Sequence, residues 1–204
     1  MKIIVFGASG GVGQEVVRQA LDANHEVTAF VRDLAKLSVQ HPHLTMVQGD
    51  GLDEKAVSLA IQGHDAVLCC VGNKGMGATT LMSDIVRNII AGMTQHGVNR
   101  IAYVASAGIH KELKGLIGSF VGFLLRNPLA DHRRSYELLQ KTHLQWTLAR
   151  PMQLTNGEQT SLYRETETGV AHGGQKISRA DVAHFLLKAL ADDTYVNKSI
   201  GLVY

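Results

Sequence analysis

The most constraining feature of this chain is a glycine-rich turn that follows directly on its first apolar run. Residues Ile3–Phe6 are all apolar, and Gly7, Gly10 and Gly13 then lead into an amphipathic stretch. A strand, a glycine turn and a helix in this order aim backbone N–H groups and the positive end of a helix at one point, where a diphosphate can bind. The spacing is a variant of the dinucleotide-binding fingerprint, and an ordinary turn is the alternative interpretation. The residues predicted to contact the diphosphate are Gly7, Ser9, Gly10, Gly11, Val12 and Gly13.

Short apolar runs alternate with helical patterns through the first three quarters of the sequence. Such runs are typical of the strands of a parallel sheet that is covered by helices on both faces. The predicted strands are Lys2–Phe6, Glu26–Val31, Leu44–Gln48, Ala66–Val71, Ile101–Ala105 and Gln145–Ala149. The predicted helices are Val12–Ala23, Asp53–Ile61, Thr79–His96 and Asp131–Lys141. With right-handed crossovers, this order predicts an α/β fold with a Rossmann-type doubly wound parallel sheet.

The last quarter of the chain has a different pattern. Residues 155–174 are polar and rich in glycine, which predicts a loop with one short strand near Ser161–Arg164. Ser178 and Asp181 form a capping box that begins a helix, and Ser199–Val203 is predicted to be a final strand. We therefore expect a small C-terminal substrate lobe attached to the nucleotide-binding sheet.

Length and composition argue against several classes of protein. With 204 residues, 45% of them hydrophobic, the chain fits one globular domain spanning residues 1–204. A net charge of +2 without a cluster of Lys and Arg argues against a nucleic-acid partner. The longest apolar stretch, Leu116–Leu125, is too short to span a membrane. Ten scattered His residues and the adjacent Cys69 and Cys70 predict neither a metal site nor a disulfide, so we expect a cytoplasmic protein.

Arg32 follows the second predicted strand, close to where NAD-dependent enzymes place an acidic residue on the ribose. A guanidinium there can fork onto the 2′-phosphate of NADP, and Lys36 supplies a second cation. Ser9 of the glycine turn can donate a hydroxyl. The competing interpretation assigns the ribose to Asp33, which we interpret instead as a helix N-cap. The sequence therefore favours NADPH over NADH as the cofactor.

Two further strand ends add predicted cofactor contacts. Asp50 and Gly51 follow the third strand, and the Asp50 carboxylate can accept from the adenine amino group or cap the next helix. Val71, Gly72 and Asn73 follow the fourth strand, where a glycine lets the backbone approach the cofactor's ribose or merely forms a strand-to-loop turn. Because ligands of open α/β sheets collect at the carboxyl ends of parallel strands, we expect these residues to line one nucleotide site.

In the second half of the chain no tyrosine is followed four residues later by a lysine. In such a catalytic Tyr–Lys pair both side chains lie on one helix face, and the lysine lowers the tyrosine pKa. Tyr136 is the nearest candidate, but Gln140 stands four residues later. Interconversion of ketones and alcohols by the usual route is therefore disfavoured. Hydride delivery to an acceptor that takes its proton from water does not need this pair, and oxidised flavin is such an acceptor.

Four residues after the fifth and sixth strands are candidates for contacts at the nicotinamide. Ser106 is the candidate catalytic residue, because it can hydrogen-bond the carboxamide or an acceptor atom; alternatively it satisfies a local turn. Pro151 fixes the backbone near the nicotinamide, and Gln153 offers both a donor and an acceptor. Arg150 belongs to the same site or is a structural ion-pair partner.

Stretches along nearly the whole chain match one known family. They are residues 4–10, 31–33, 49–50, 64–67, 87–89, 96–98, 106–107, 131–132 and 177–178 with Asp181. On these stretches the chain resembles the atypical short-chain dehydrogenase/reductases of the NmrA-like superfamily, in particular the NAD(P)H-binding group that contains biliverdin-IXβ reductase/flavin reductase. The resemblance implies NADPH as hydride donor, Ser106 beside the nicotinamide, and an open pocket for flavins or other flat conjugated acceptors. The family position matching Gln153 holds a histidine discussed as a proton donor, so tetrapyrrole reduction in particular is disfavoured.

Substrate contacts are expected mainly from residues 107–130 and 151–178. The first segment carries Phe120 and Phe123, which form a lid over a flat aromatic ligand in one interpretation and a core helix or dimer contact in the other. The expected partners are a flat aromatic or conjugated small molecule and, for a homodimer rather than a monomer, a second copy. The leading hypothesis is an NADPH-dependent oxidoreductase with flavin as a substrate rather than a prosthetic group. The alternative is a redox-sensing regulator of NmrA type that binds NAD(P) without turnover.

Overall fold

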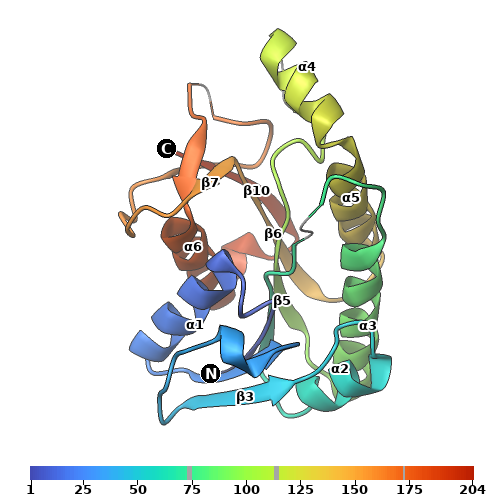
Figure 1. The fold of residues 1–204 in the computed structure, drawn as a ribbon, viewed down its shortest axis with the longest axis vertical. Helices are drawn as coiled ribbons and strands as arrows, with labels where there is room; N and C mark the ends of the chain where they lie inside the picture. Colours follow the sequence, from blue (N-terminus) through green and yellow to red (C-terminus); the bar gives the residue numbers. More distant parts are fainter. Residues whose placement is uncertain (73–74, 113–114, 172) are drawn as a thin grey trace.

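The protein is built around a parallel sheet, as its computed structural model shows for residues 1–72, 75–112, 115–171 and 173–204, with only the backbone of residues 116 and 117. In these residues eight strands form a sheet in the order β3-β2-β1-β4-β5-β6-β10-β8, and β7 pairs with β9 in a separate two-stranded sheet (Figure 1). The strands are β1 (Lys2–Phe6), β2 (Glu26–Val31), β3 (Leu44–Gln48), β4 (Ala66–Cys69), β5 (Arg100–Val104), β6 (Gln145–Pro151), β7 (Gln153–Thr155), β8 (Arg164–Thr166), β9 (Lys176–Ser178) and β10 (Lys198–Val203). Only β8 runs antiparallel to its described neighbour. The predicted Rossmann-type fold is confirmed, with its switch point between β1 and β4.

Helices cover both faces of the sheet. They are α1 (Gly11–Asp22), α2 (Glu54–Ile61), α3 (Leu81–His96), α4 (Gly115–Leu124), α5 (Arg126–Gln140) and α6 (Arg179–Ala191), with the short 3-10 helices η1 (Leu34–Lys36) and η2 (Asp193–Tyr195). On one face α1 packs against α6, and on the other α3 packs against α2 and α5 (Figure 1). Successive residues of a strand point to opposite faces. Accordingly Ile3 and Val5 of β1 belong to the core beside α1 and α6, whereas Ile4 and Phe6 belong to the core beside α2, α3 and α5.

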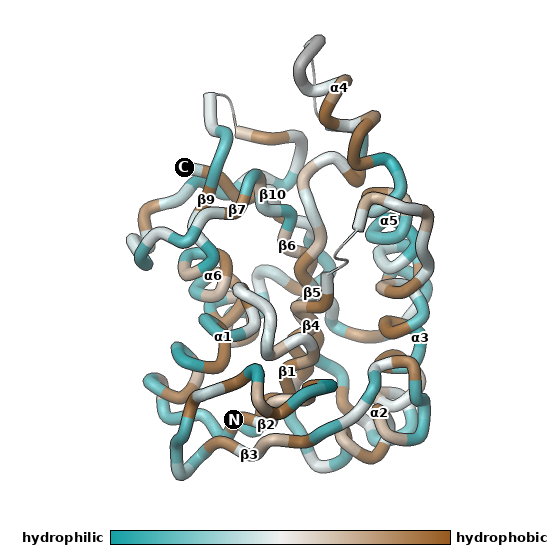
Figure 2. Tube along the Cα trace, in the orientation of Figure 1, coloured by the Kyte–Doolittle hydropathy of each residue, from teal (hydrophilic) through white to brown (hydrophobic). Residues whose placement is uncertain are grey.

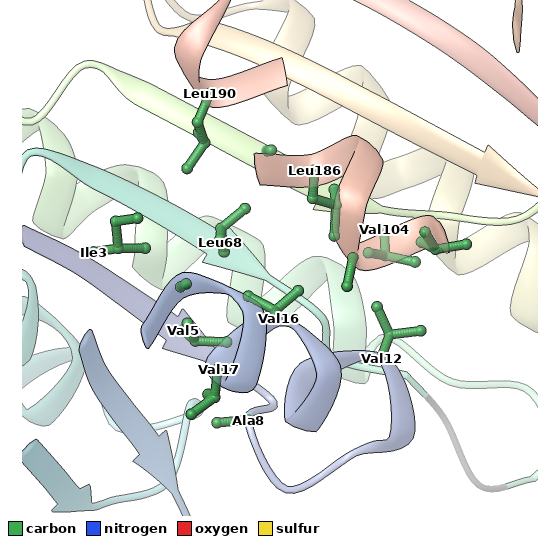
Figure 3. Packing of buried hydrophobic residues seen from close by; sticks show 14 of the residues in the cluster. Ile3, Val5, Ala8, Val12, Val16, Val17, Leu68, Val104, Leu186 and Leu190 are labelled. Carbon is green, nitrogen blue, oxygen red and sulfur yellow. The ribbon is translucent and has the colours of Figure 1, made fainter. Parts of the chain in front are cut away.

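The core between α1, α6 and the sheet holds the glycine turn in place. Val16 and Val17 of α1 are fully buried and belong to one apolar cluster with Leu68 of β4 and Leu186 of α6, with Val17 beside Ala8 (Figure 3). Full burial of a valine side chain stabilises a protein by roughly 1.5–3 kcal/mol. Because the turn leads directly into this buried helix, the position of its N–H groups is determined by the core.

The predicted elements agree with the structure most closely at the start of the chain. The strands Lys2–Phe6, Glu26–Val31 and Leu44–Gln48 are confirmed to the residue. The fourth strand ends two residues earlier than predicted, and the sixth continues to Pro151, whose neighbour in β10 is Leu202. A proline is compatible with the last position of a strand because fewer ladder bonds are needed there. The short strand expected near Ser161–Arg164 forms instead as β8.

Helix α5 begins five residues earlier than predicted and supports the loop that follows β4. Its Asp131 side chain is fully buried and accepts hydrogen bonds from the backbone N–H groups of Met82 and Ser83, at 2.9 and 3.2 Å, and from the Ser83 hydroxyl at 2.6 Å. Thr80, the residue before α3, makes no capping bond of its own. Asp131 therefore supplies from another helix the cap that α3 lacks.

Helix α4 stands away from the body of the protein, at the outer end of α5 (Figure 1). Phe120 and Phe123 are 67% and 65% exposed, so the interpretation of this segment as a core helix is wrong for these side chains. Apolar residues nevertheless continue along much of the helix (Figure 2). None of the helices in the described part of the chain is long and apolar enough to cross a bilayer.

Candidate functional site

The glycine turn packs backbone against backbone at the switch point of the sheet. Gly7 has a φ of +76°, and a Cβ atom there would lie 2.7 Å from the Cys70 carbonyl oxygen. A Cβ on Gly13 would overlap the carbonyl oxygen of Gly7. The Gly10 amide donates to this same oxygen at 2.9 Å, which closes the turn. Each of these three glycines is thus explained by a positive φ or by its place in the closed turn.

The first turn of α1 offers unpaired N–H groups to a ligand. The N-cap is Gly10, which has no side chain to accept from them, and the first turn contains no acidic residue. The amides of the first helical residues, Gly11, Val12 and Gly13, have no acceptor within the helix. Their partial positive charge favours an anion at this point.

A cleft runs from the glycine turn across the carboxyl ends of β1, β2, β3 and β4. Among the described residues it is lined by Phe6, Gly7, Ser9, Gly10, Phe30, Val31, Arg32, Asp33, Lys36, Gly49, Asp50, Gly51, Cys70, Val71, Gly72, Leu81 and Ile85. The structure thus brings together predicted residues from four separate strand ends. Of the predicted cofactor contacts, Asn73 lies outside the described residues.

The β2 end of the cleft carries one unpaired cation and one neutralised carboxylate. The Arg32 side chain is exposed, and no carboxylate of the described residues lies within ion-pair distance of it. Asp33 accepts from the Ala35 amide at 3.1 Å and lies 3.4 Å from the Lys36 ammonium. The interpretation of Asp33 as an N-cap is therefore confirmed, for the short helix η1. Because Asp33 already has two partners, Arg32 is the more available group for a ligand.

At the β3 end of the cleft, Asp50 is exposed toward the cleft, whereas Gly51 and Asp53 have structural roles. Asp50 is exposed and accepts from the Leu52 amide at 3.0 Å, whereas Asp53 caps α2. The alternative in which Asp50 caps the following helix is therefore wrong. Gly51 is buried against Ile85, so a packing requirement explains this glycine. The Asp50 carboxylate still faces the cleft.

The β4 end of the cleft contains a glycine that the protein's own packing does not explain. Strand β4 stops at Cys69, so Val71 and Gly72 belong to the loop that follows it. A Cβ atom on Gly72 would meet nothing within 4 Å in the described structure. Its conformation does not require glycine either, because its φ lies outside the positive range. The close approach of a cofactor ribose to Gly72 therefore stays a prediction.

The residues predicted to surround the nicotinamide lie beyond the described cleft lining. Ser106 is half-buried, and its hydroxyl donates to the Ala107 carbonyl at 3.1 Å, the local turn bond considered as its alternative role. The Ala107 amide donates to the Pro151 carbonyl at 3.0 Å, so these two segments are adjacent. Gln153 is exposed on β7. The segments that carry Ser106 and Pro151 are therefore adjacent, whereas Gln153 begins the separate strand β7.

Arg150 is a structural residue. Its guanidinium is fully buried, lies 2.5 Å from the Glu112 carboxylate and donates to backbone carbonyls in the turn after β8 and at Ser199. Both partners of the ion pair are shielded from solvent, since the side chain of Glu112 is 5% exposed. The structural alternative stated for Arg150 is thus confirmed.

Two tyrosines of the second half, Tyr136 and Tyr103, are held in structural contacts. The Tyr136 hydroxyl accepts from Gln140 at 2.7 Å, and its ring packs against Trp146 at the beginning of β6 and against His110 after β5. Tyr103 is fully buried, and its hydroxyl lies 2.6 Å from Nδ1 of His132. Burial raises the pKa of both tyrosines. Neither is placed or activated as a proton relay, in agreement with the missing lysine.

Sequence reasoning identified the capping box at the start of α6 but not the full role of Asp181. The predicted bond is present, because the Asp181 amide donates to the Ser178 hydroxyl at 2.9 Å. The Asp181 carboxylate also accepts from the amides of Thr160 and Ser161, at 2.9 and 2.7 Å, and from the Tyr204 hydroxyl at 2.7 Å. Burial alone would raise its pKa, but these hydrogen bonds lower it, so the carboxylate stays charged. Asp181 thereby ties the loop before β8 to α6.

Comparison with known proteins agrees with the architecture of the site. A family described as NAD(P)H-binding matches residues 7–193. The chain is 26% identical over 223 residues to the photosystem II assembly factor Ycf39 of Synechocystis, covering all of this chain but only 62% of that protein's length. The likeness to NAD(P)H-binding reductases noted from the sequence is thereby confirmed.

Two solved structures show the same fold. A short-chain dehydrogenase/reductase from Veillonella parvula in complex with NADP superposes with a TM-score of 0.85 at 21% identity, covering 98% of this chain and 93% of that one. ChuY, an anaerobillin reductase from Escherichia coli O157:H7, superposes with a TM-score of 0.82 at 21% identity, covering 100% and 97%.

The unexplained Gly72 leads to a prediction that separates ligand contact from packing. Gly72→Ala should leave the free energy of unfolding within about 0.5 kcal/mol of wild type, because the added methyl group has open space. It should weaken NADPH binding at least roughly tenfold, because the methyl group would meet the cofactor. Calorimetric titration and urea denaturation measure the two effects. Gly77→Ala, in open space on the same loop, is the control, and unchanged NADPH affinity in Gly72→Ala would contradict the assignment.

The buried pair of Tyr103 and His132 predicts a pH dependence of stability. Burial lowers the pKa of His132 to about 4. Because the unfolded chain regains the ordinary value of about 6.5, it binds a proton that the folded chain excludes, and stability falls as the pH drops between these values. The free energy of unfolding should fall by up to about 3 kcal/mol between pH 7 and pH 4 on account of this group. Urea denaturation of His132→Gln should show a shallower pH slope than wild type. His43→Gln, at an exposed histidine, should keep the wild-type slope, and identical slopes in both variants would refute the prediction.

Proposed function

The chain belongs to the NAD(P)H-binding family, and on that premise we propose that it is an NADPH-dependent oxidoreductase that transfers a hydride to a flavin or a similar flat conjugated acceptor. The observation that carries this proposal is the cleft, which is lined by Gly7, Ser9 and the N-cap Gly10 at the start of α1 and by the exposed Arg32 after β2, so that the positive end of that helix and the guanidinium border the same space. A dinucleotide phosphate presents one diphosphate and one 2′-phosphate, which matches these two positive groups.

In this proposal each part of the cleft holds one part of the cofactor. The turn from Gly7 to Gly13 binds the diphosphate, and Arg32 with Lys36 binds the 2′-phosphate. The cleft-facing Asp50 accepts from the adenine amino group, and Gly72 lies beside the ribose. The nicotinamide would then lie toward Ser106, Pro151 and Gln153. The match to a family described as NAD(P)H-binding supports the first assignments. The last one rests on the position of β5 and β6, which follow β4 on one side of the switch point.

The choice of acceptor follows from the missing proton relay. NADPH, when bound, supplies a hydride, and an oxidised flavin takes that hydride together with one proton from water. Tyr136 accepts from Gln140 and packs against Trp146 and His110, and no lysine stands four residues after it, so the usual Tyr–Lys relay to a ketone oxygen is missing. The remaining task of the protein is orientation, for which Ser106 is the candidate group. The exposed phenylalanines of α4 supply an apolar surface that suits a flat ring system.

A second function is a regulator that binds NAD(P) and senses redox state without turnover. Two observations favour it: the absence of the Tyr–Lys pair, and the similarity to a protein named as an assembly factor. The chain spans less than two thirds of that relative, so the whole relative's activity does not transfer directly.

Turnover distinguishes the two functions. We expect the purified protein to oxidise NADPH in the presence of FMN or riboflavin well above the protein-free rate, followed through the absorbance of reduced nicotinamide. The variant Gly13→Ala, in which the methyl group would overlap the Gly7 carbonyl, is the inactive control. Tight cofactor binding without oxidation in the presence of flavins, quinones and azo dyes would favour the regulator.

Cofactor preference provides an independent prediction. Arg32→Asp should weaken NADPH binding roughly tenfold to a hundredfold and NADH binding far less, because only NADPH carries the 2′-phosphate that the guanidinium would bind. Titration calorimetry with both cofactors measures the ratio. Lys141→Asp makes the same charge change at the far end of α5 and should alter neither affinity. Equal losses for the two cofactors in Arg32→Asp would exclude its proposed role.

A further inference from the structure

Arg179 brings a positive charge from the distant end of the chain to the glycine turn. It is the first residue of α6, which packs beside α1 (Figure 1). The buried side chain of Gln19 in α1 donates to the Ala180 carbonyl at 2.9 Å, which joins the two helices close to Arg179. This bond joins the N-terminal turn of α6 to the C-terminal half of α1.

The Arg179 side chain lies directly over Gly11. A Cβ atom on Gly11 would be 2.6 Å from Cδ and 2.7 Å from Nε of Arg179. The φ of Gly11 is not positive, so its backbone conformation does not require glycine. Leaving aside the backbone of α1 and the residues next to Gly11, the described atoms nearest to that Cβ position all belong to Arg179. A methyl group at Gly11 would therefore meet the flexible arginine side chain rather than backbone and would displace it.

The charge of Arg179 is not neutralised by the protein. The Nη1 atom of Arg179 donates to Oδ1 of Asn156 at 2.5 Å. This acceptor belongs to a neutral amide, so it does not balance the positive charge. No carboxylate of the described residues lies within ion-pair distance of it, unlike Arg150 with Glu112 or Arg18 with Glu15. A guanidinium carries five N–H donors, so most of them are available for a ligand.

We propose that Arg179 binds the diphosphate of the cofactor, with Asn156 as the residue that positions its guanidinium. This inference rests on the proposed cofactor site. The diphosphate would receive the first-turn amides of α1 from one side and the planar fork of Arg179 from the other, an arrangement suited to two negative charges. Arg32 and Arg179 then act on different phosphates: Arg32 distinguishes NADPH from NADH, whereas Arg179 contacts a group that both cofactors share.

This division of roles gives the test. Arg179→Gln should weaken NADPH and NADH by the same factor, roughly tenfold to a hundredfold, and leave the ratio of the two affinities unchanged. It should leave the affinity for adenosine 2′-monophosphate, which has no diphosphate, as in wild type. Arg18→Gln removes one positive charge from the middle of α1, where Arg18 is paired with Glu15 and Asp22, and is the control for long-range charge. Both variants are compared by titration calorimetry, with thermal melting as the check on folding.

A double-mutant cycle makes the test independent of any single variant. Gly11→Ala should displace the Arg179 side chain and weaken both cofactors, and this loss should be largely absent in the Arg179→Gln background. Additive losses, or an Arg179→Gln affinity within twofold of wild type, would overturn the role of Arg179 while leaving the cofactor site intact. Wild-type protein that binds neither NADPH nor NADH would overturn the proposed function and this inference together.

Discussion

The contact on which the site depends is the approach of the glycine turn to the end of β4. Gly7, in a left-handed conformation, leaves no room for a side chain beside the Cys70 carbonyl, and Gly13 leaves none beside Gly7. Backbone thus meets backbone at the switch point of the sheet. Helix α1 consequently begins at the carboxyl edge, where its N-cap Gly10 lines the cleft and the Arg179 side chain of α6 lies over Gly11. The buried valines of α1 hold it there.

Sequence patterns predicted the local features of this arrangement. Strands β1, β2 and β3 were predicted to the residue because each is a short run of residues that favour strands and is followed by a polar or glycine residue. The cap at Asp33 and the capping box at Ser178 were also accessible, since each involves residues only two or three apart. The ends of β4 and β6 were less accurate. Where a strand stops depends on which neighbour continues beside it, and β10 extends β6 as far as Pro151.

Contacts between residues far apart in the chain could not be predicted in this way. Asp131 caps a helix that begins about fifty residues earlier, and Asp181 holds a loop about twenty residues earlier. Periodicity describes the element that a residue belongs to, not the partner it meets. For Arg150 the sequence left two roles open, and only its burial against Glu112 decided between them. Arg179 was seen from the sequence only as part of a capping box.

The two sides of the protein differ in how they are built, and this difference bears on how its relatives diverge. On one side, the cleft is lined by the short loops that follow β1, β2 and β3, and these strands are anchored in the core. On the other side, α4 is an outlying helix with exposed phenylalanines (Figure 1). A lineage can lengthen, shorten or replace such an appendage with little loss of core packing. One scaffold can in this way acquire new chemistry by exchanging its periphery while the inherited nucleotide platform stays the same.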